Sequence, residues 1–407
     1  MRLKKVILIH KKKKNNTIVS KNREKLLQFS PAKLFCTKQL KIICAPKKTM
    51  LKCVRQHVLT KEEAAMTITE IAKKSGVSIG TVDRVLHNRG KVSEKTKLAV
   101  EAVIEKYGYT PNPLARTLKK NKPFVIGVLM PPPGSGSGYW QMIFKGMKEA
   151  EAELSAFGIK LEFEYFDRTE YGSMTKASQR LFEKNLQALI TVPIVPQEAE
   201  EIFSQIKIPY IFVDSPLPRA NPTITIAQNP YRGGQCAGHI MKLLKKSGKF
   251  SVLRFYKDSY NLLERLRGFT DYFKHDTSCQ VIETICPNGS NQGIFNFLDN
   301  LFKSEPEING IFATHTEGFI IGQYLSYTNR KSKVALISYD MQEQNRNGLM
   351  TGNIDCVISQ RPEYQGYTSV NEIFKSKVLL QEIPQRIFVP IDVIFKENAG
   401  EYNPIKS

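Results

Sequence analysis

The chain lacks long apolar runs. In its 407 residues no stretch reaches the about 18 to 20 apolar residues that cross a bilayer, so we expect no transmembrane helix. The apolar segment at residues 6–9 is too short for the core of a secretory signal, and four lysines follow it.

Cysteine is scarce as well. Its seven residues are scattered, without a CxxC pair or the spacing of zinc ligands, which favours buried free thiols in a reducing cytoplasm.

The usual sequence signatures of enzymes are also absent. The chain contains no GxSxG elbow, no HExxH helix and no GxGxxG fingerprint. Residues 131–138 are rich in glycine but lack the GK[ST] ending of a phosphate-binding loop, which argues against an NTPase. We therefore predict no catalytic residue, no metal site and no cofactor.

Positive charge is abundant and lies near the N-terminus. The chain has a net charge of +22, and residues 1–65 alone hold 18 Lys and Arg against 3 Glu. This leader shows no sustained periodicity and should not fold alone. It is either a basic arm that binds DNA phosphates non-specifically or a stretch upstream of the natural start, which we expect at Met66.

The remaining charge divides the chain further. Residues 66–122 hold 12 Lys and Arg against 5 acidic residues, a net charge of +7, which leaves residues 123–407 without net charge. A basic segment beside a neutral one indicates a nucleic-acid-binding domain joined to a domain that binds a small molecule.

Residues 66–86 carry the pattern of two short helices joined by a glycine turn. Thr67 can cap the first helix and has Glu70 three residues later, as in a capping box, and Ser78 can cap the second. Gly76 suits a left-handed position in the turn. We expect four apolar side chains to meet as one small core: Ile71, Val77, Val82 and Val85. The pattern predicts a helix-turn-helix.

The second of these helices leaves a face outside that core. Its positions are Ile79, Gly80, Asp83, Arg84 and His87, and an exposed arginine on a helix with a capped N-terminus suits the DNA major groove. Arg84 can reach guanine O6 and N7, and Ile79 can touch a thymine methyl. We expect base reading to depend mainly on these two residues.

A third helix and a proline-led segment follow. Ser93 can cap a helix that runs to about Tyr107 and ends at Gly108, and Tyr109-Thr-Pro-Asn-Pro113 then leads into Leu114-Ala-Arg-Thr-Leu118. Three helices and this segment, in this order and spacing, resemble the headpiece and hinge helix of the lactose-repressor (LacI/GalR) family of bacterial transcription regulators. The alternative, a three-helix bundle without a DNA role, does not require the segment at 109–118.

The resemblance implies a set of DNA-binding residues. Leu118 occupies the position where relatives insert a leucine between base steps in the minor groove. The full set on the helices and the hinge is Thr67, Ser78, Ile79, Gly80, Thr81, Asp83, Arg84, His87, Asn88, Asn112, Ala115 and Leu118.

Beyond residue 123, short β-branched runs alternate with amphipathic segments. Strands are predicted at 124–129, 160–165, 188–192, 210–213, 251–255, 281–285, 310–313, 334–337 and 356–359, and helices at 139–156, 174–184, 231–246, 262–273, 292–302, 318–327 and 363–375. This alternation predicts parallel sheets with helices on both faces, in two α/β lobes with a ligand cleft between them. It is similar to the effector domain of the same family and to periplasmic sugar-binding proteins.

The predicted organisation has five parts. They are a leader (1–65), a helix-turn-helix domain (66–110), a hinge helix and linker (111–122), a two-lobed effector domain (123–395) and a tail (396–407). The resemblance implies that the lobes cross over near residues 227 and 361, and that a last strand at 391–395 returns.

Candidate ligand residues lie where predicted strands end, and the resemblance supports them: Tyr139, Trp140, Asp214, Arg265, His315, Thr316, Asp340 and Gln360. Aromatic rings can stack on a sugar or nucleobase, and a carboxylate can accept two hydroxyl hydrogen bonds. The alternatives are a buried core aromatic for Trp140, helix caps for the two aspartates and a surface salt bridge for Arg265. His315-Thr316 replaces the usual Asn-Asp of the family, which leaves the ligand open.

The sequence thus predicts a cytoplasmic, homodimeric transcriptional regulator. Its partners would be operator DNA and a sugar-like effector, with no membrane association. Two alternatives are a periplasmic-type binding protein without a DNA role and an α/β metabolic enzyme; an assay for turnover would identify the second.

Overall fold

The protein consists of two units. The computed structural model describes residues 66–86, 88–109, 123–255, 259–287 and 290–405, and the boundary between the two units falls between residues 111 and 112. The leader and the hinge segment predicted from the sequence lie outside the described residues. The cysteines at 236, 279, 286 and 356 are free thiols, and Cys286 and Cys356 are buried.

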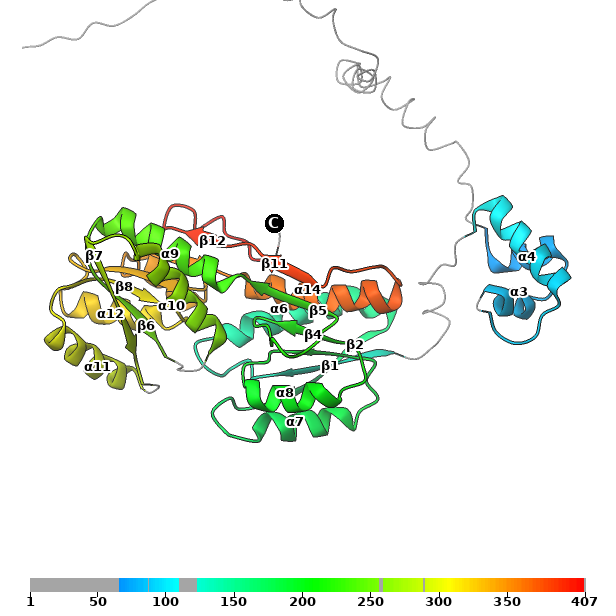
Figure 1. Cartoon of the computed structure of the whole chain (residues 1–407), viewed down its shortest axis with the longest axis horizontal. Helices are drawn as coiled ribbons and strands as arrows, with labels where there is room; N and C mark the ends of the chain where they lie inside the picture. The colour runs from blue at the N-terminus through cyan, green and yellow to red at the C-terminus, as the bar shows by residue number, and fades with distance from the viewer. Residues whose placement is uncertain (1–65, 87, 110–122, 256–258, 288–289, 406–407) are drawn as a thin grey trace, which may run out of the picture. The chain divides into compact units, whose positions relative to one another are not determined.

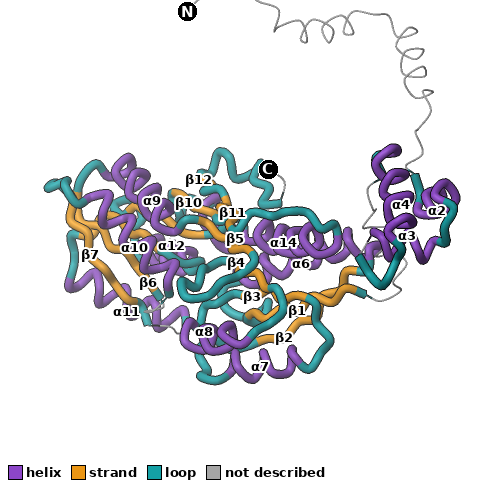
Figure 2. Tube along the Cα trace, turned by 45° about the vertical axis from the view of Figure 1, so that its right-hand side comes forward, coloured by secondary structure: helices purple, strands orange, loops and turns teal. Residues whose placement is uncertain are grey.

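The described part of the first unit contains three helices, labelled in Figure 2: α2 (Ile68–Ser75), α3 (Ile79–Leu86) and α4 (Glu94–Tyr107). The expected capping box is present, because the Thr67 hydroxyl accepts from the backbone N–H of Glu70 and the Glu70 carboxylate accepts from that of Thr67. Gly76 and Gly108 end α2 and α4 in the left-handed conformation, with φ of 67° and 60°.

The core of this unit is small. Ile71, Val82 and Val100 have no exposed surface, and one residue from each helix therefore meets at the centre. Val77 and Val85 pack against them, as the sequence predicted. The helix-turn-helix is confirmed, and burial of Val82 and Val85 fixes which side of α3 faces outward.

The second unit is built from two sheets, each with helices on both faces (Figure 1). The first sheet has the spatial order β11 (Arg386–Val389), β5 (Ile224–Gln228), β4 (Tyr210–Val213), β3 (Ala188–Thr191), β1 (Phe124–Met130) and β2 (Ile159–Tyr165). Every pair in it is parallel. Parallel strands buried on both faces require near-continuous apolar runs, which β1, β3 and β4 have.

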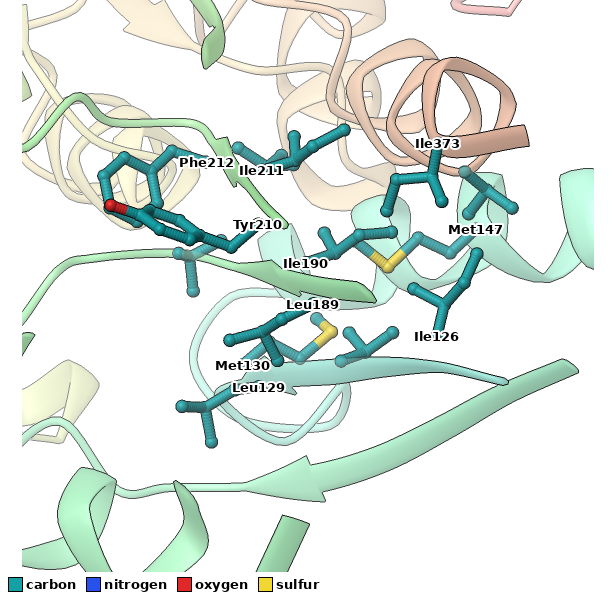
Figure 3. Packing of buried hydrophobic residues seen from close by; sticks show 14 of the residues in the cluster. Ile126, Leu129, Met130, Met147, Leu189, Ile190, Tyr210, Ile211, Phe212 and Ile373 are labelled. Carbon is teal, nitrogen blue, oxygen red and sulfur yellow. The ribbon is translucent and has the colours of Figure 1, made fainter. Parts of the chain in front are cut away.

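Four α-helices of the described residues cover this first lobe. Two lie on one face, α6 (Tyr139–Leu154), which a short helix η2 (Ser155–Phe157) follows, and α14 (Pro362–Ile373), which a π-helical turn η3 (Phe374–Val378) extends. The other face carries α7 (Ser173–Phe182) and α8 (Pro196–Gln205). Figure 3 shows the core between sheet and helices, where Ile190 of β3 lies near Met147 of α6 and Ile373 of α14.

The second lobe repeats this plan. Its sheet has the order β12 (Asp392–Ile394), β10 (Cys356–Ser359), β9 (Ala335–Tyr339), β8 (Ile308–Ala313), β6 (Gly248–Arg254) and β7 (Cys279–Ile285), with β12 antiparallel to β10. The helices are α9 (Pro230–Lys245), α10 (Tyr260–Phe273), α11 (Asn291–Ser304), α12 (Gly318–Tyr327) and α13 (Glu343–Met350). The two-lobed α/β fold class is therefore confirmed.

Glycines let one helix pair in each lobe approach closely. In the second lobe a β-carbon on Gly234 of α9 would overlap the carbonyl oxygen of Arg265 on α10, and one on Gly268 of α10 would overlap the carbonyl oxygen of Tyr231. Gly146 and Gly366 play the same part between α6 and α14. Backbone-to-backbone packing of this kind holds α10 rigidly against α9, which sets the position of Arg265.

Three connections join the lobes. The chain passes from the first lobe to the second between β5 and α9, returns between β10 and α14, and passes again between β11 and β12. At the second passage Arg361 adopts a left-handed conformation (φ 48°), and its Nε and Nη2 donate to the Asp392 carboxylate at 2.6 and 2.9 Å. This ion pair ties the second and third connections together.

Candidate functional site

The outward face of α3 contains four of the five residues that the sequence predicted for it. Ile79 is 47% exposed although it is a large aliphatic residue, and Gly80, Asp83 and Arg84 are exposed beside it. Ile79 does not belong to the apolar core that the described residues of this unit form, so its side chain is available for contact with another molecule. His87, Asn112, Ala115 and Leu118 lie outside the described residues.

The hydroxyl residues predicted to contact DNA have local roles as well. The Thr67 oxygen belongs to the capping box, and Ser78 accepts from the backbone N–H of Thr81 at 3.1 Å while the two side chains share a hydrogen bond of 2.9 Å. These caps hold the first turns of α2 and α3 in place. Asn88 follows α3 in the left-handed conformation (φ 48°).

One cavity between the lobes brings together all eight predicted ligand residues. Five more residues complete its lining: Arg168, Ile194, Ser259, Asn261 and Leu262. Its volume is about 40 Å³, well below the roughly 300 to 1,000 Å³ of common small-molecule pockets. A ligand of sugar size therefore requires the lobes or the lining side chains to move.

Two carboxylates line this cavity, one from each lobe, at the carboxyl ends of equivalent strands. Asp214 follows β4 of the first lobe and Asp340 follows β9 of the second, and both adopt the left-handed conformation, with φ of 72° and 61°. Such a conformation costs a non-glycine residue on the order of 1 to 2 kcal/mol and is concentrated at binding sites. Both aspartates are buried.

Asp214 is engaged mainly by the protein itself. Its carboxylate accepts from the Tyr139 hydroxyl, from the Ser215 hydroxyl at 2.8 Å and from the Asn261 amide at 3.2 Å. Asn261 also donates to the Asp214 carbonyl oxygen at 3.1 Å. Because Asn261 belongs to α10, these bonds connect the two lobes at the cavity.

Asp340 has more free accepting capacity. Gln360 donates to it twice, through its backbone N–H at 3.1 Å and its side-chain amide at 3.0 Å. Burial raises the pKa of Asp340 to about 7, against the opposing influence of the Arg265 charge. A carboxyl that titrates near neutrality can both donate and accept hydrogen bonds with a polyol.

Arg265 has donors that the protein does not satisfy. Its Nη1 donates to the Thr314 carbonyl at 2.8 Å, and its guanidinium lies 3.5 Å from the centre of the Tyr339 ring. Its Nε and Nη2 are buried without an acceptor among the described residues, and the Asn261 Oδ1 likewise has no donor. Unpaired buried polar atoms in a cavity point to groups that a ligand satisfies.

The histidine of the cavity is neutral. Burial, and then the charges of Arg168 and Arg265, lower the pKa of His315 to about 3. Its Nδ1 lies against Glu317, and the neighbouring Thr316 shares a hydrogen bond with Ser137 of the first lobe. His315 therefore serves as a neutral hydrogen-bonding group in the cavity.

Tyr139 and Trp140 combine the two roles considered for aromatic residues at this position, burial in the core and contact with a ligand. Tyr139 and Trp140 are both buried in the core of the first lobe and both line the cavity, with their rings 4.9 Å apart in an edge-on arrangement. Burial, followed by the charges of Asp214 and Asp340, raises the pKa of Tyr139 well above its usual value. The Tyr139 hydroxyl therefore remains protonated and donates to Asp214.

Arg168 and Asn261 line the cavity but are not among the residues predicted from the sequence. Arg168 lies in the loop after β2, a strand end that could have been searched for polar residues like the others. Asn261 is four residues before Arg265 on α10, so helical periodicity places both on one face. This spacing in the sequence could have identified Asn261 as a residue of the cavity.

A helix-turn-helix unit with an exposed helix face, joined to a two-lobed α/β unit with a polar cavity between its lobes, defines a DNA-binding regulator with an effector domain. Sequence profiles agree with this class. The profile of the lacI family of bacterial regulatory proteins matches residues 67–112, and that of the periplasmic binding protein domain matches residues 126–375.

Individual proteins give the same result. The chain is 28% identical to the ribose operon repressor of Bacillus subtilis over 250 residues, 61% of this chain and 72% of that protein. It is 25% identical to the HTH-type transcriptional regulator MalR of Streptococcus pneumoniae over 263 residues, 61% of this chain and 76% of that protein. A crystal structure assigned to a LacI transcriptional regulator of Bacteroides fragilis has a TM-score of 0.65 and 28% identity, covering 69% of this chain and all of that one.

The chain belongs to the LacI family of bacterial regulatory proteins. It is a DNA-binding transcription regulator whose effector domain has the periplasmic-binding-protein fold. Among the helices that the structure describes, none is long and apolar enough to cross a membrane.

Proposed function

We propose that this regulator changes its affinity for operator DNA when a small polar ligand, a sugar or a related metabolite, binds between its two lobes in the cytoplasm. The observation that carries the proposal is the cavity itself, which gathers Tyr139, Trp140, Asp214, Arg265, His315, Thr316, Asp340 and Gln360 around unpaired buried polar atoms.

The chemistry of the cavity favours a polyol. Within the described residues, Arg265 offers two donor nitrogens without an acceptor, Asn261 offers an oxygen without a donor, and Asp340 offers a carboxyl that can accept further hydrogen bonds. Hydroxyl groups both donate and accept, so a carbohydrate can satisfy all three at once. Trp140 adds an apolar surface against which a sugar ring can stack. The relative from Bacillus subtilis, a ribose operon repressor, supports a sugar.

The proposed switch depends on the angle between the lobes. Hydrogen bonds such as Asn261 to Asp214 already cross the cavity, and a ligand adds contacts to both lobes at the same place. The ligand then biases one lobe angle and, in a homodimer, the spacing of two hinge segments on a near-palindromic operator. The coupling energy expected for such a switch is about 1 to 3 kcal/mol.

A binding screen tests the effector half of the proposal. We would follow thermal unfolding of the full chain with sugars, sugar phosphates and nucleosides, using fluorescence of Trp140, the only tryptophan. A ligand present at 100 times its Kd should stabilise the protein by about 2.7 kcal/mol. Asp340→Asn should remove that stabilisation, whereas a matched change outside the cavity, Asp271→Asn, should not. Stabilisation that survives Asp340→Asn would contradict the assigned site.

A DNA assay tests the other half. An operator selected from random duplexes should be bound by the full chain, and the affinity should change when the ligand from the screen is added. Leu118→Ala should weaken binding and reduce DNA bending, because an apolar wedge kinks the base step it enters. An affinity that the ligand leaves unchanged would refute the switch but not the binding site.

We propose binding without turnover, in contrast to a metabolic enzyme of the same fold class. Recovery of the unchanged ligand after prolonged incubation with the protein, measured by mass spectrometry, is the expected result. Conversion of the ligand at a rate that scales with protein concentration would overturn it.

A further inference from the structure

A second pocket lies between the lobes, outside the cavity assigned to the effector. Its volume is about 280 Å³, close to the roughly 300 Å³ at which small-molecule sites begin. Both lobes line it. The first lobe contributes Pro216, β5 and β11, and the second contributes the start of α9 and one face of α10. It is seven times larger than the effector cavity in volume, about 280 against about 40 Å³.

The sheet register explains why a hollow forms here. Arg386 and Phe388 of the edge strand β11 pair with Thr225 and Ala227 of β5, so the four side chains project from the same face of the sheet. Thr225 and Ala227 are small, whereas Arg386 and Phe388 are large and stand at the open edge. The small pair forms a floor and the large pair forms a wall of the pocket.

The other wall is a face of α10 that the effector cavity does not use. Tyr260, Glu264 and Arg267 recur at helical spacing and line this second pocket, whereas Asn261 and Arg265 of the same helix line the effector cavity. One rigid helix therefore separates two sites and contributes side chains to both.

The lining combines aromatic rings with excess positive charge. Phe388 is 60% exposed, which is unusual for so large an apolar side chain, and Tyr260 is also exposed. Arg267 stacks on Tyr231 and forms an ion pair with Glu264 at 2.5 Å. Arg386 stacks on Phe388 and has no carboxylate partner in the part of the chain that the structure describes. Its charge is therefore available to a ligand.

We propose that this second pocket binds a planar anion, an aromatic ring that carries one carboxylate or phosphate group. The ring stacks on the exposed aromatic side chains, and the anionic group pairs with Arg386, because guanidinium groups bind carboxylate and phosphate oxygens through paired N–H donors. Binding of the anion goes beyond the proposed effector function and does not depend on it, whereas its coupling to the effector rests on that function.

The position of the pocket couples it to the lobe angle. A molecule held between β11 and α10 touches both lobes next to the first connection, whose residues Gln228, Asn229 and Pro230 also line the pocket. Gln228 accepts from the Tyr339 hydroxyl at 2.8 Å, and the Tyr339 ring lies against Arg265 of the effector cavity. The planar anion thus acts on the same lobe movement as the effector, with reciprocal coupling between the two ligands.

Calorimetric titration of the full chain tests the site with two probes, adenosine 5′-monophosphate for the phosphate and 4-hydroxybenzoate for the carboxylate. Adenosine and 4-hydroxybenzamide are the neutral counterparts. We expect at least one anion to bind with a saturable isotherm, and its neutral counterpart to bind about tenfold or more weakly. Which of the two anions binds distinguishes phosphate from carboxylate. Absence of saturable binding by both, or equal binding of the neutral counterpart, would overturn the proposal.

Variants locate the binding. Phe388→Ala and Arg386→Gln should each weaken the anion about tenfold or more, whereas Tyr327→Ala and Arg219→Gln, which change an exposed aromatic and an exposed arginine elsewhere, should leave it unchanged. Asp340→Asn should also leave it unchanged, which excludes binding in the effector cavity. Binding that persists in Phe388→Ala and Arg386→Gln, or that Asp340→Asn abolishes, would assign the anion to another site.

Trp140 fluorescence tests the coupling separately. Because Trp140 lines the effector cavity, a change in lobe angle alters its surroundings. The bound anion should shift its emission in the wild type and not in Phe388→Ala. Saturable binding without any shift would overturn the coupling.

Discussion

Replacement of Asp340 by Asn should change how the stability of the effector domain depends on pH. Asp340 is 2% exposed, and burial raises its pKa to about 7 from an ordinary value of 3.8. Asn keeps the shape of the side chain. Its carbonyl can accept from the Gln360 backbone N–H, and the Gln360 amide can turn to accept from the new NH2 group, so the local hydrogen bonds survive.

The sign and size of this pH dependence follow from the pKa of Asp340 in the folded and in the unfolded chain. Between pH 3.8 and about 7 the folded domain keeps a proton on Asp340 that the unfolded chain has released. The free energy of unfolding that this proton contributes is therefore fully present below pH 3.8 and is lost as the pH rises through 7. Between pH 5 and pH 8 the wild type should lose roughly 2 to 3 kcal/mol that the Asn variant does not lose. Other titrating groups cancel in the comparison of the two proteins.

Urea unfolding followed by Trp140 fluorescence measures this difference. Trp140 lies in the first lobe of the effector domain and is the only tryptophan, so the signal does not report the helix-turn-helix unit. We would determine the free energy of unfolding of both proteins at pH 5, 6, 7 and 8. A stability difference between wild type and variant that stays constant across this range would refute the buried titration of Asp340.

Three further predictions concern other parts of the chain. Arg84→Ala should cost about 1 to 3 kcal/mol of binding free energy on the selected operator and much less on random DNA, measured by fluorescence anisotropy; equal losses on both would remove its base-reading role. Thr67→Ala should destabilise the helix-turn-helix unit by about 1 kcal/mol in thermal unfolding followed by circular dichroism, because the capping box is lost, and an unchanged midpoint would contradict this. Gly234→Ala should destabilise the effector domain by about 1 to 3 kcal/mol in urea, since its β-carbon would overlap the Arg265 carbonyl; Gly352→Ser, at a glycine with open space around it, provides a comparison for strain without overlap, and an equal effect there would refute the overlap argument.

Local signals in the sequence were sufficient to predict most of the helices and strands. The capping box at Thr67 and the glycines at 76 and 108 act within a few residues, so the helix boundaries of the first unit could be predicted directly. Apolar runs likewise predicted β4 and β10 with their observed bounds, because strands buried on both faces need such runs.

Elements whose stability depends on distant partners were missed. The strand β11 is four residues long, lies at a sheet edge and has two exposed side chains, so only its pairing with β5, over 150 residues earlier in the chain, makes it a strand. The helix α13 contains two asparagines and a glycine, which disfavour helix formation, and it is held by packing on α12 and β10. The strand β5 and the helix α8 were also not predicted.

The sequence by itself determined the presence of a helix-turn-helix, the two-lobed α/β plan and the candidate ligand residues, since strand ends in such a plan converge on one edge of each sheet. Only the tertiary structure decided which hydrogen-bond donors and acceptors of those residues remain available to a ligand. Asp214 already accepts hydrogen bonds from Tyr139, Ser215 and Asn261, whereas Arg265 keeps donors that no acceptor in the described residues pairs with. Hydrogen-bond partners, burial and the resulting pKa of Asp340 depend on side chains brought from distant elements, and no local pattern in the chain encodes those distances.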